Sequence, residues 1–208
     1  PNPMHLAVSG NIGSGKTTLT EKLAKHYGWK AEFEAVDDNP YLPDFYEDMK
    51  RWSFHLQVYF LNSRFNQLKT IQGSSDSTIQ DRTIYEDAYI FAANLYKSNL
   101  LSERDYANYK SLFDSMISHV KAPDLLIYLK ADIPKLVGQI EKRGRSYETA
   151  MRIDYLKNLN SHYEEWIAGY KEGKLLIIDV NDLDFVERPA DFSFIVEKIE
   201  REIFGLFA

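Results

Sequence analysis

A glycine-rich segment near the start of the chain limits its possible folds more than any other feature. Residues 10–17 match the P-loop pattern G-x-x-x-x-G-K-[ST] and read Gly10-Asn11-Ile12-Gly13-Ser14-Gly15-Lys16-Thr17. The apolar run His5–Ser9 precedes this segment, and a helical pattern over Lys16–Tyr27 follows it. A strand, a glycine-rich loop and a helix in this order let backbone N–H groups enclose a phosphate. The sequence therefore predicts an α/β fold that binds a nucleotide.

The side chains at the end of this loop indicate how the nucleotide is bound. Lys16 suits the β- and γ-phosphate oxygens, and the hydroxyl of Thr17 suits a Mg²⁺ ion. Thr18 follows directly in the helical pattern, and we include it among the nucleotide contacts. The expected cofactors are therefore ATP and Mg²⁺.

Short apolar runs alternate with longer helical patterns along the rest of the chain. Further strands are expected at Lys30–Glu34, Thr78–Asp81, Leu125–Leu129 and Leu175–Val180. Helices are expected at about Lys50–Ile71, Tyr85–Tyr96, Ser102–Val120, Asp132–Gly144, Met151–Tyr170 and Ala190–Phe204, with Pro40 and Pro43 in an irregular segment before the first of them. Strands separated by helices predict one five-stranded parallel sheet covered on both faces. No linker is visible, so we expect a single domain over residues 4–208, with residues 1–3 as an added remnant before a natural Met4.

Composition and charge argue against several classes of protein. The chain has 31 acidic and 25 basic residues and a net charge of −6, which disfavours nucleic-acid polymers and anionic membranes as partners. It has no cysteine, which excludes disulfides and thiolate metal sites and fits a reducing cytoplasm. No apolar run approaches the roughly 18–20 residues that cross a bilayer. We therefore expect a cytoplasmic protein.

Missing motifs narrow the nucleotide-binding classes further. A GTPase switch would carry the sequences N-K-x-D and D-x-x-G, and neither occurs. A mechanical ATPase usually has a longer chain than these 208 residues. A kinase for a small molecule is the leading class, and a nucleotide-sensing module without catalysis is the alternative outside the enzymes.

Six blocks of residues occur in order along the chain. They are the P-loop, Glu34, Tyr46 with Arg51-Trp52-Ser53-Phe54 and Gln57, Asp81-Arg82-Thr83 with Asp87 and Tyr89-Ile90-Phe91-Ala92, Arg143-Gly144-Arg145 with Glu148, and Asp179-Val180-Asn181 with Asp184-Phe185. Together they resemble the deoxynucleoside kinases, and within these the bacterial deoxyadenosine and deoxyguanosine kinases. The resemblance implies Mg²⁺- and ATP-dependent phosphorylation of the 5′-hydroxyl of a deoxynucleoside in nucleotide salvage. Deoxyadenosine is the first candidate, with deoxyguanosine and deoxycytidine after it, and a homodimer is implied.

The resemblance also implies roles around the transferred phosphoryl group. Glu34 is expected to accept the proton of the 5′-hydroxyl, Arg82 to contact this base and the phosphoryl group, and Asp81 to be a Mg²⁺ partner. Arg143 and Arg145 are expected in a lid over the phosphates. On spacing alone, with Glu32 and Asp37 nearby, a solvated glutamate at a strand end is the favoured interpretation of Glu34.

Further roles concern the nucleoside and the adenine of the donor. The resemblance implies that Gln57, Phe60, Arg64, Asp87 and Phe91 surround the acceptor's base, Tyr46 and Glu148 bind its 3′-hydroxyl, and Asp184 and Phe185 lie beneath the donor's adenine. The residues agree in part, because Gln57, Phe60 and Arg64 share one face of their helix. Arg64 and Asp87 are expected to form a buried pair whose polar ends face the base, and Asp87 can accept a hydrogen bond from an exocyclic amine, which thymine lacks. A core glutamine and a surface salt bridge remain the plainer interpretation of the same pattern.

A second kinase class also has a P-loop and an Asp-Arg pair, namely the nucleoside monophosphate kinases that resemble thymidylate kinase. Their acceptor is a phosphate, so cations are expected at the acceptor end. Glu34 at that position argues against this alternative.

Overall fold

The computed structural model describes residues 2–34, 38–142 and 149–205. Its contacts divide the chain into two compact units. The sheet unit comprises Pro1–Phe33, Ser75–Arg82 and Ala122–Ala208, and the helical unit comprises Glu34–Ser74 and Thr83–Lys121. Each unit is thus assembled from segments that are far apart in the sequence.

The sheet unit is built on parallel strands in the order β2-β3-β1-β4-β5. They are β1 (His5–Gly10), β2 (Lys30–Glu32), β3 (Thr78–Asp81), β4 (Leu125–Lys130) and β5 (Lys174–Asp179). In the central strand, Leu6, Ala7 and Val8 have no exposed surface, as expected for a parallel strand with helices on both sides. The loop after β1 therefore leaves the sheet at the middle of its carboxyl edge, where open α/β sheets bind ligands.

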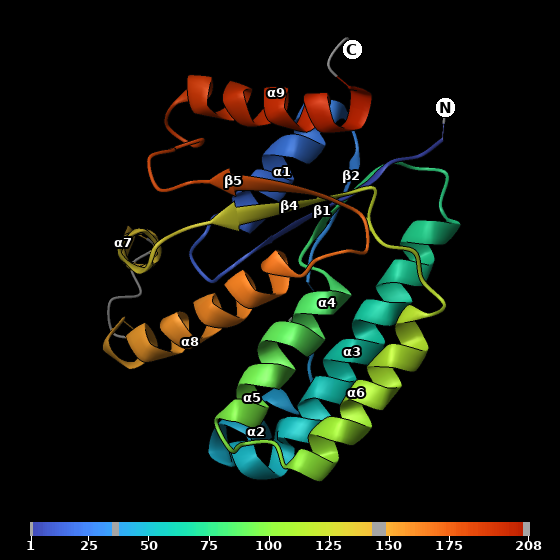
Figure 1. Ribbon diagram of the computed structural model, residues 1–208, viewed down its shortest axis with the longest axis vertical. Coiled ribbons are helices and arrows are strands. Elements are labelled where there is room, and N and C mark those ends of the chain that lie inside the picture. The colour runs from blue at the N-terminus through green and yellow to red at the C-terminus, as the bar shows by residue number, and fades with distance from the viewer. Residues whose placement is uncertain (1, 35–37, 143–148, 206–208) are drawn as a thin grey trace. The chain divides into compact units, whose positions relative to one another are not determined.

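Helices cover both faces of this sheet (Figure 1). Helices α1 (Lys16–Tyr27) and α9 (Pro189–Phe204) lie on one face, and α8 (Thr149–Ala168), preceded by α7 (Ile133–Lys142), lies on the other. On the α8 face, the ring of Tyr128 in β4 stacks on Tyr163, with 5.9 Å between the ring centroids. The five-stranded parallel sheet with helices on both faces is therefore confirmed.

The helical unit is formed by one long helix and shorter ones around it. Its helices are α2 (Leu42–Glu47), α3 (Met49–Gly73), α4 (Ile84–Glu86), which continues through the π-helical segment Asp87–Ala92 into α5 (Ala93–Lys97), and α6 (Glu103–Ile117). α3 packs against α6 (Figure 1). The buried residues of α3 include leucines together with the polar side chains of Gln57 and Arg64. The long helix thus buries two residues that the sequence places in the candidate site.

Several boundaries differ from the sequence predictions. β2 ends at Glu32 rather than Glu34, because this edge strand pairs with β3 only from Lys30 to Glu32. Helix α2 was not predicted. Pro43 stands in its first turn, where backbone N–H groups have no intrahelical acceptor, so a proline without an N–H is tolerated there. The helix predicted at Tyr85–Tyr96 exists but includes the π-helical turn.

Within the described residues, none of the helices combines the length and apolar character needed to cross a membrane.

Candidate active site

The P-loop leads from β1 into α1 with glycines where only glycine fits. Gly13 and Gly15 have φ angles of 87° and 93°, in the left-handed region that side chains disfavour. A Cβ on Gly13 would lie 2.8 Å from the carbonyl oxygen of Leu136, and a Cβ on Gly15 would lie 2.8 Å from Cζ of Phe185. α1 then begins at Lys16 with no acidic residue in its first turn. The partial positive charge of this helix end is therefore available to a phosphate.

A buried asparagine ties the start of the P-loop to α8. Asn11 is 2% exposed, and its Nδ2 donates to the carbonyl oxygen of Leu156 at 3.0 Å and to Oδ1 of Asn160 at 3.1 Å. Its Oδ1 accepts from the backbone N–H of Ile12 at 2.8 Å. Asn160 in turn donates to the carbonyl oxygen of Ala131 at 3.3 Å. The loop is held by side-chain bonds before any ligand binds.

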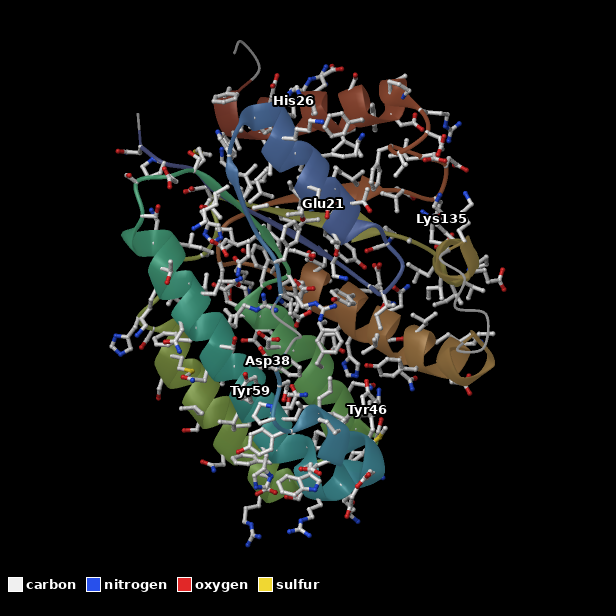
Figure 2. All side chains as sticks on the ribbon, turned by 180° about the vertical axis from the view of Figure 1, so that it is seen from behind. Glu21, His26, Asp38, Tyr46, Tyr59 and Lys135 are labelled. Carbon is white, nitrogen blue, oxygen red and sulfur yellow. The ribbon has the colours of Figure 1, made fainter. Side chains whose placement is uncertain are left out.

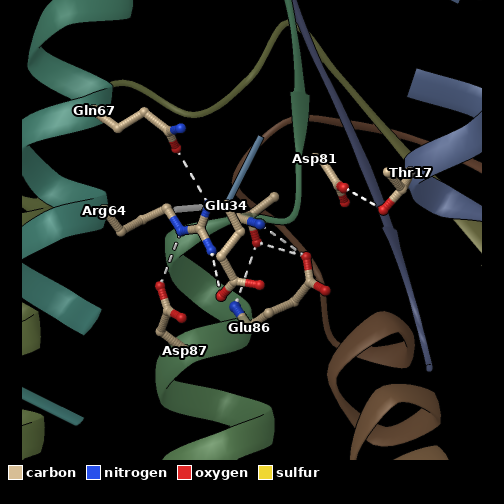
Figure 3. Close-up of polar contacts among 8 residues, drawn as sticks. Thr17, Glu34, Arg64, Gln67, Asp81, Glu86 and Asp87 are labelled. Carbon is tan, nitrogen blue, oxygen red and sulfur yellow. Dashed lines mark hydrogen bonds and ion pairs between the residues drawn. The ribbon is translucent and has the colours of Figure 1, made fainter. Parts of the chain in front are cut away.

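Thr17 and Asp81 meet beside the P-loop. The hydroxyl of Thr17 donates to Oδ2 of Asp81 at 2.6 Å (Figure 3), and Asp81 is 5% exposed at the end of β3. Hard oxygen donors of this kind suit Mg²⁺, which usually takes one or two protein oxygens and fills its other positions with phosphate and water. No group of three or more His, Asp or Glu side chains in the described part of the chain could hold a metal by itself. The pair fits a Mg²⁺ ion that is shared with a nucleotide.

The helical unit holds an arginine between two carboxylates (Figure 3). Arg64 of α3 donates from Nε to Oδ2 of Asp87 and from Nη2 to Oε1 of Glu34, each at 3.2 Å. Its Nη1 donates to Oε1 of Gln67, also at 3.2 Å. The side chains of Arg64 and Asp87 are 4% and 5% exposed, so their geometry is set by packing as well as by charge. All three guanidinium nitrogens have an acceptor.

Glu34, Arg64 and Asp87 are thus brought together, as the sequence predicted for the last two. Gln57 is buried about two turns before Arg64 in α3, and Phe60 is half-buried. Phe91 lies in the same π-helical segment as Asp87. Burial raises the pKa of Tyr109 well above its ordinary value, with a contribution from the negative charge of Asp87.

The structure also describes Tyr46, Asp184 and Phe185, which the sequence analysis placed in the site. Tyr46 projects from α2 and is 65% exposed (Figure 2). Phe185 is 6% exposed and packs against Gly15 in the core of the sheet unit. The backbone N–H groups of Glu187 and Val186 donate to Asp184 and lower its pKa. The predicted lid residues Arg143 and Arg145, and Glu148, lie outside the described residues.

The sequence interpretation did not include Gln67 or Asn160. Gln67 stands three residues after Arg64, a spacing that places two side chains side by side on a helix. This spacing could have identified it. Asn160 had no comparable signal, because its partner Asn11 is 149 positions away in the sequence.

Comparison with known proteins shows which family the chain resembles over most of its length. The family model described as deoxynucleoside kinase matches residues 6–204. A deoxyadenosine/deoxycytidine kinase of Bacillus subtilis is 41% identical over 201 residues, which cover 96% of this chain and 93% of that protein. A deoxyguanosine kinase of Lactobacillus acidophilus is 37% identical, covering 93% of this chain and 88% of that protein.

A solved structure has the same fold over nearly the whole chain. It is a deoxyadenosine kinase from M. mycoides with bound dATP, with a TM-score of 0.80 and 30% identity. The match covers 95% of this chain and 99% of that one. On its P-loop, its parallel sheet and these relatives, the chain belongs to the deoxynucleoside kinase family.

Proposed function

We propose that this kinase transfers the γ-phosphoryl group of ATP to the 5′-hydroxyl of deoxyadenosine. The observation that carries the proposal is the cluster in the helical unit, where one buried arginine holds both a candidate base, Glu34, and a candidate reader of the nucleobase, Asp87. The names of the relatives, which include deoxyadenosine and deoxycytidine kinases, support the same class of acceptor.

The sheet unit is proposed to bind the donor. The backbone of residues 10–15 encloses the phosphates, Lys16 neutralises the β- and γ-oxygens, and Thr18 contacts the nucleotide in the first turn of α1. Thr17 and Asp81 are proposed to hold Mg²⁺, which neutralises phosphate charge when bound. Asp184 and Phe185 are proposed near the adenine of the donor, and Phe185 also supports Gly15 from the core.

The acceptor is proposed to be bound through its sugar and activated by Glu34. Glu34 accepts the proton of the 5′-hydroxyl as the oxygen bonds to the γ-phosphorus and the bond from phosphorus to the β–γ bridging oxygen breaks, leaving ADP. A carboxylate suffices because positioning and charge stabilisation contribute most in phosphoryl transfer. Arg64 orients the carboxylate of Glu34 through the contact at 3.2 Å. Tyr46 and Glu148 are proposed to bind the 3′-hydroxyl, and Arg82, Arg143 and Arg145 the transferred phosphoryl group.

The base is proposed to be read by Gln57, Arg64 and Asp87, with Phe60 and Phe91 against its ring. A carboxylate has about four lone-pair sites, so Asp87 can accept from Arg64 and from the 6-amino group of adenine. The Gln57 amide offers both a donor and an acceptor to the Watson–Crick edge of adenine. Thymine would place its O4 carbonyl against Asp87, with no proton between them. This difference predicts a preference for deoxyadenosine over thymidine.

We also propose a single kinase domain over residues 4–208, since the family model matches residues 6–204 and so includes segments of both units. The proposal includes a homodimer in the cytoplasm, as the sequence and the resemblance imply. Size-exclusion chromatography with light scattering tests the dimer, and a mass of 24.2 kDa would contradict it.

The test of function is the initial rate of phosphorylation of the four deoxynucleosides and adenosine, with ATP and Mg²⁺. We expect the highest kcat/KM for deoxyadenosine, and a value for thymidine that is lower by at least about 10². Absence of transfer to any nucleoside, with transfer to a nucleoside monophosphate, would overturn the proposed acceptor class.

A further inference from the structure

Arg82 has a backbone conformation that arginine rarely adopts. Its φ angle is 72°, and the other described residues with positive φ besides glycine are Asp38 and Asn99. Asp and Asn tolerate this left-handed region because their short side chains bond locally, whereas a long side chain such as that of arginine gains nothing there. Such a conformation persists only where the surroundings impose it.

The peptide groups on both sides of Arg82 are anchored. The N–H of Arg82 donates to the carbonyl oxygen of Val8 at 2.9 Å, which continues the pairing of β3 with β1. The N–H of Thr83, on the other side, donates to Oε1 of Glu86 at 2.9 Å. Because the N–H groups of Arg82 and Thr83 are both hydrogen-bonded, the backbone of Arg82 has little freedom to adopt other φ and ψ angles.

Glu86 holds the second of these anchors through a reciprocal set of bonds. Its Oε1 also accepts from the hydroxyl of Thr83 at 3.1 Å, and its N–H donates back to that hydroxyl at 3.3 Å. Thr83 and Glu86 thus form a capping box at the start of α4. Figure 3 shows Glu86 with these contacts.

A capping box does not have to be buried in order to begin a helix. Glu86 is 0% exposed and Thr83 is 2% exposed, although burying a carboxylate is costly without hydrogen bonds. α6 begins with a surface cap instead, where Ser102 accepts from the N–H of Asp105 at 3.1 Å. An exposed cap of this kind is sufficient for a helix in this chain.

We propose that Thr83 and Glu86 are positioning residues that hold the backbone of Arg82 in its left-handed conformation and thereby direct its guanidinium to the transferred phosphoryl group. The inference rests on the proposed function, in which Arg82 contacts that group. Glu86 acts here through its oxygen, as the acceptor for the N–H of Thr83, and it has no exposed surface of its own.

The test is steady-state kinetics of Glu86→Ala and Glu86→Gln with ATP and deoxyadenosine. In Glu86→Ala, Arg82 relaxes to a negative φ, and we expect kcat to fall by about 10–100-fold, the scale of effect that misplacing a catalytic group produces. The KM values should stay within about threefold, because the P-loop and the Arg64 cluster are untouched. Glu86→Gln keeps an oxygen acceptor of the same reach and should restore kcat to within about threefold.

A double-mutant cycle with Arg82→Lys identifies the residue through which Glu86 acts. If Glu86 works through Arg82, Glu86→Ala should lower kcat little further in the Arg82→Lys background. Ser102→Ala is the matched control: it removes the cap of α6 and should lower the melting temperature without changing kcat. If Glu86→Ala does not fold, Glu86→Leu, which fills a similar volume and has no oxygen acceptor, takes its place with the same expectations.

Three results would overturn the inference: wild-type kcat in Glu86→Ala or its replacement, equally low kcat in Glu86→Gln, or additive effects in the cycle. An inactive wild-type protein would instead overturn the proposed function, so the two failures are distinguishable.

Discussion

Glu34 and Glu32 are two carboxylates close together in the chain with different partners. Glu32 belongs to β2 and pairs with Lys30 at 3.1 Å on the sheet unit's edge. Glu34 lies two residues beyond the strand, in the helical unit, and pairs with buried Arg64. The charge partner therefore distinguishes the two carboxylates, and the pairing with buried Arg64 supports Glu34 as the proposed base.

We expect Glu34→Gln to lower kcat by about 10²–10⁴, the usual range for a lost acid–base group. The KM for deoxyadenosine should change little, because the amide oxygen of Gln still accepts from Arg64. Initial rates at saturating ATP measure both parameters. Glu32→Gln is the matched control and should keep wild-type kcat; a Glu34→Gln protein with wild-type turnover would remove Glu34 from the mechanism.

Substitution of Asp87 tests whether this residue discriminates between the nucleobases of the acceptor. Asp87→Asn keeps the size of the side chain but replaces one acceptor oxygen with an N–H donor, which can meet the O4 carbonyl of thymine. The ratio of kcat/KM for deoxyadenosine to that for thymidine should therefore fall by about tenfold or more. The total rate should fall as well, since Arg64 loses the charge of a buried partner. Asp114→Asn, on the surface of α6, should leave the ratio unchanged, and an unchanged ratio in Asp87→Asn would contradict the proposed reading.

At the scale of elements, the P-loop and α1 depend on what packs behind the loop. Gly15 and Gly28 stand at the two ends of α1, with φ angles of 93° and 68°. A Cβ at Gly15 meets Phe185, whereas a Cβ at Gly28 meets nothing within 4 Å. The two glycines therefore share a backbone requirement and differ in their surroundings.

We expect Gly15→Ala to weaken ATP binding by at least about tenfold, because the clash with Phe185 and the strained φ displace the N–H groups that enclose the phosphates. Gly28→Ala should lower the free energy of unfolding by roughly 1–2 kcal/mol, the cost of a left-handed residue with a side chain, and leave ATP affinity unchanged. Isothermal titration with ATP and urea unfolding of both variants make the comparison. Equal ATP affinity in the two variants would show that the support from Phe185 is unimportant.

Helices and strands could be predicted from the sequence where a local residue pattern was strong. The P-loop and the buried strands have patterns that tertiary contacts do not override, so β1, β4 and α1 were expected nearly as they stand. The π-helical turn at Asp87–Ala92 has no such signal, because apolar periodicity does not distinguish i→i+5 from i→i+4 bonding. The early end of β2 depends on how far the edge strand pairs with β3, and no pattern within Lys30–Glu34 encodes that.

The residues of the candidate site likewise divide into those whose contacts the sequence predicted and those whose contacts it did not. Arg64 and Asp87 were predicted to pair, and they do. The contact of Arg64 with Glu34 was not predicted, since it joins residues 30 positions apart. Local spacing could have indicated Gln67 and the Thr83–Glu86 capping box, but the left-handed backbone of Arg82 follows only from the bonds on either side of it.

For the whole molecule, the family model spans both compact units, from residue 6 to residue 204. The order of the site residues along the chain alternates between the units: the P-loop, then Glu34 to Arg64, then Asp81, then Asp87. No contiguous stretch of the chain contains all the candidate site residues of one unit without including residues of the other. This interleaving is consistent with the proposed single domain.

Stability against pH is a property of the sheet unit as a whole, because His5 joins three of its segments. The Nε2 atom of its ring hydrogen-bonds with Oε1 of Gln80 in β3 at 2.8 Å. Its backbone N–H donates to Oδ2 of Asp124, just before β4, at 2.8 Å. Burial lowers the pKa of His5 below its ordinary value of 6.5, although the bond to Gln80 and the charge of Asp124 act in the opposite direction. The unfolded chain therefore binds this proton more readily than the folded one.

Since the folded-state pKa of His5 is depressed, its contribution to stability is present above about pH 6.5 and is lost as the pH falls towards the folded value. We expect the free energy of unfolding, measured by urea titration monitored by tryptophan fluorescence, to decline across this range. His5→Gln should make that decline shallower, because glutamine keeps polar contact with Gln80 and does not titrate. His119→Gln, an exposed position, serves as the control and should follow the wild-type curve. If His5→Gln and wild type lose stability in parallel, the protonation of His5 does not contribute to the acid sensitivity of the fold.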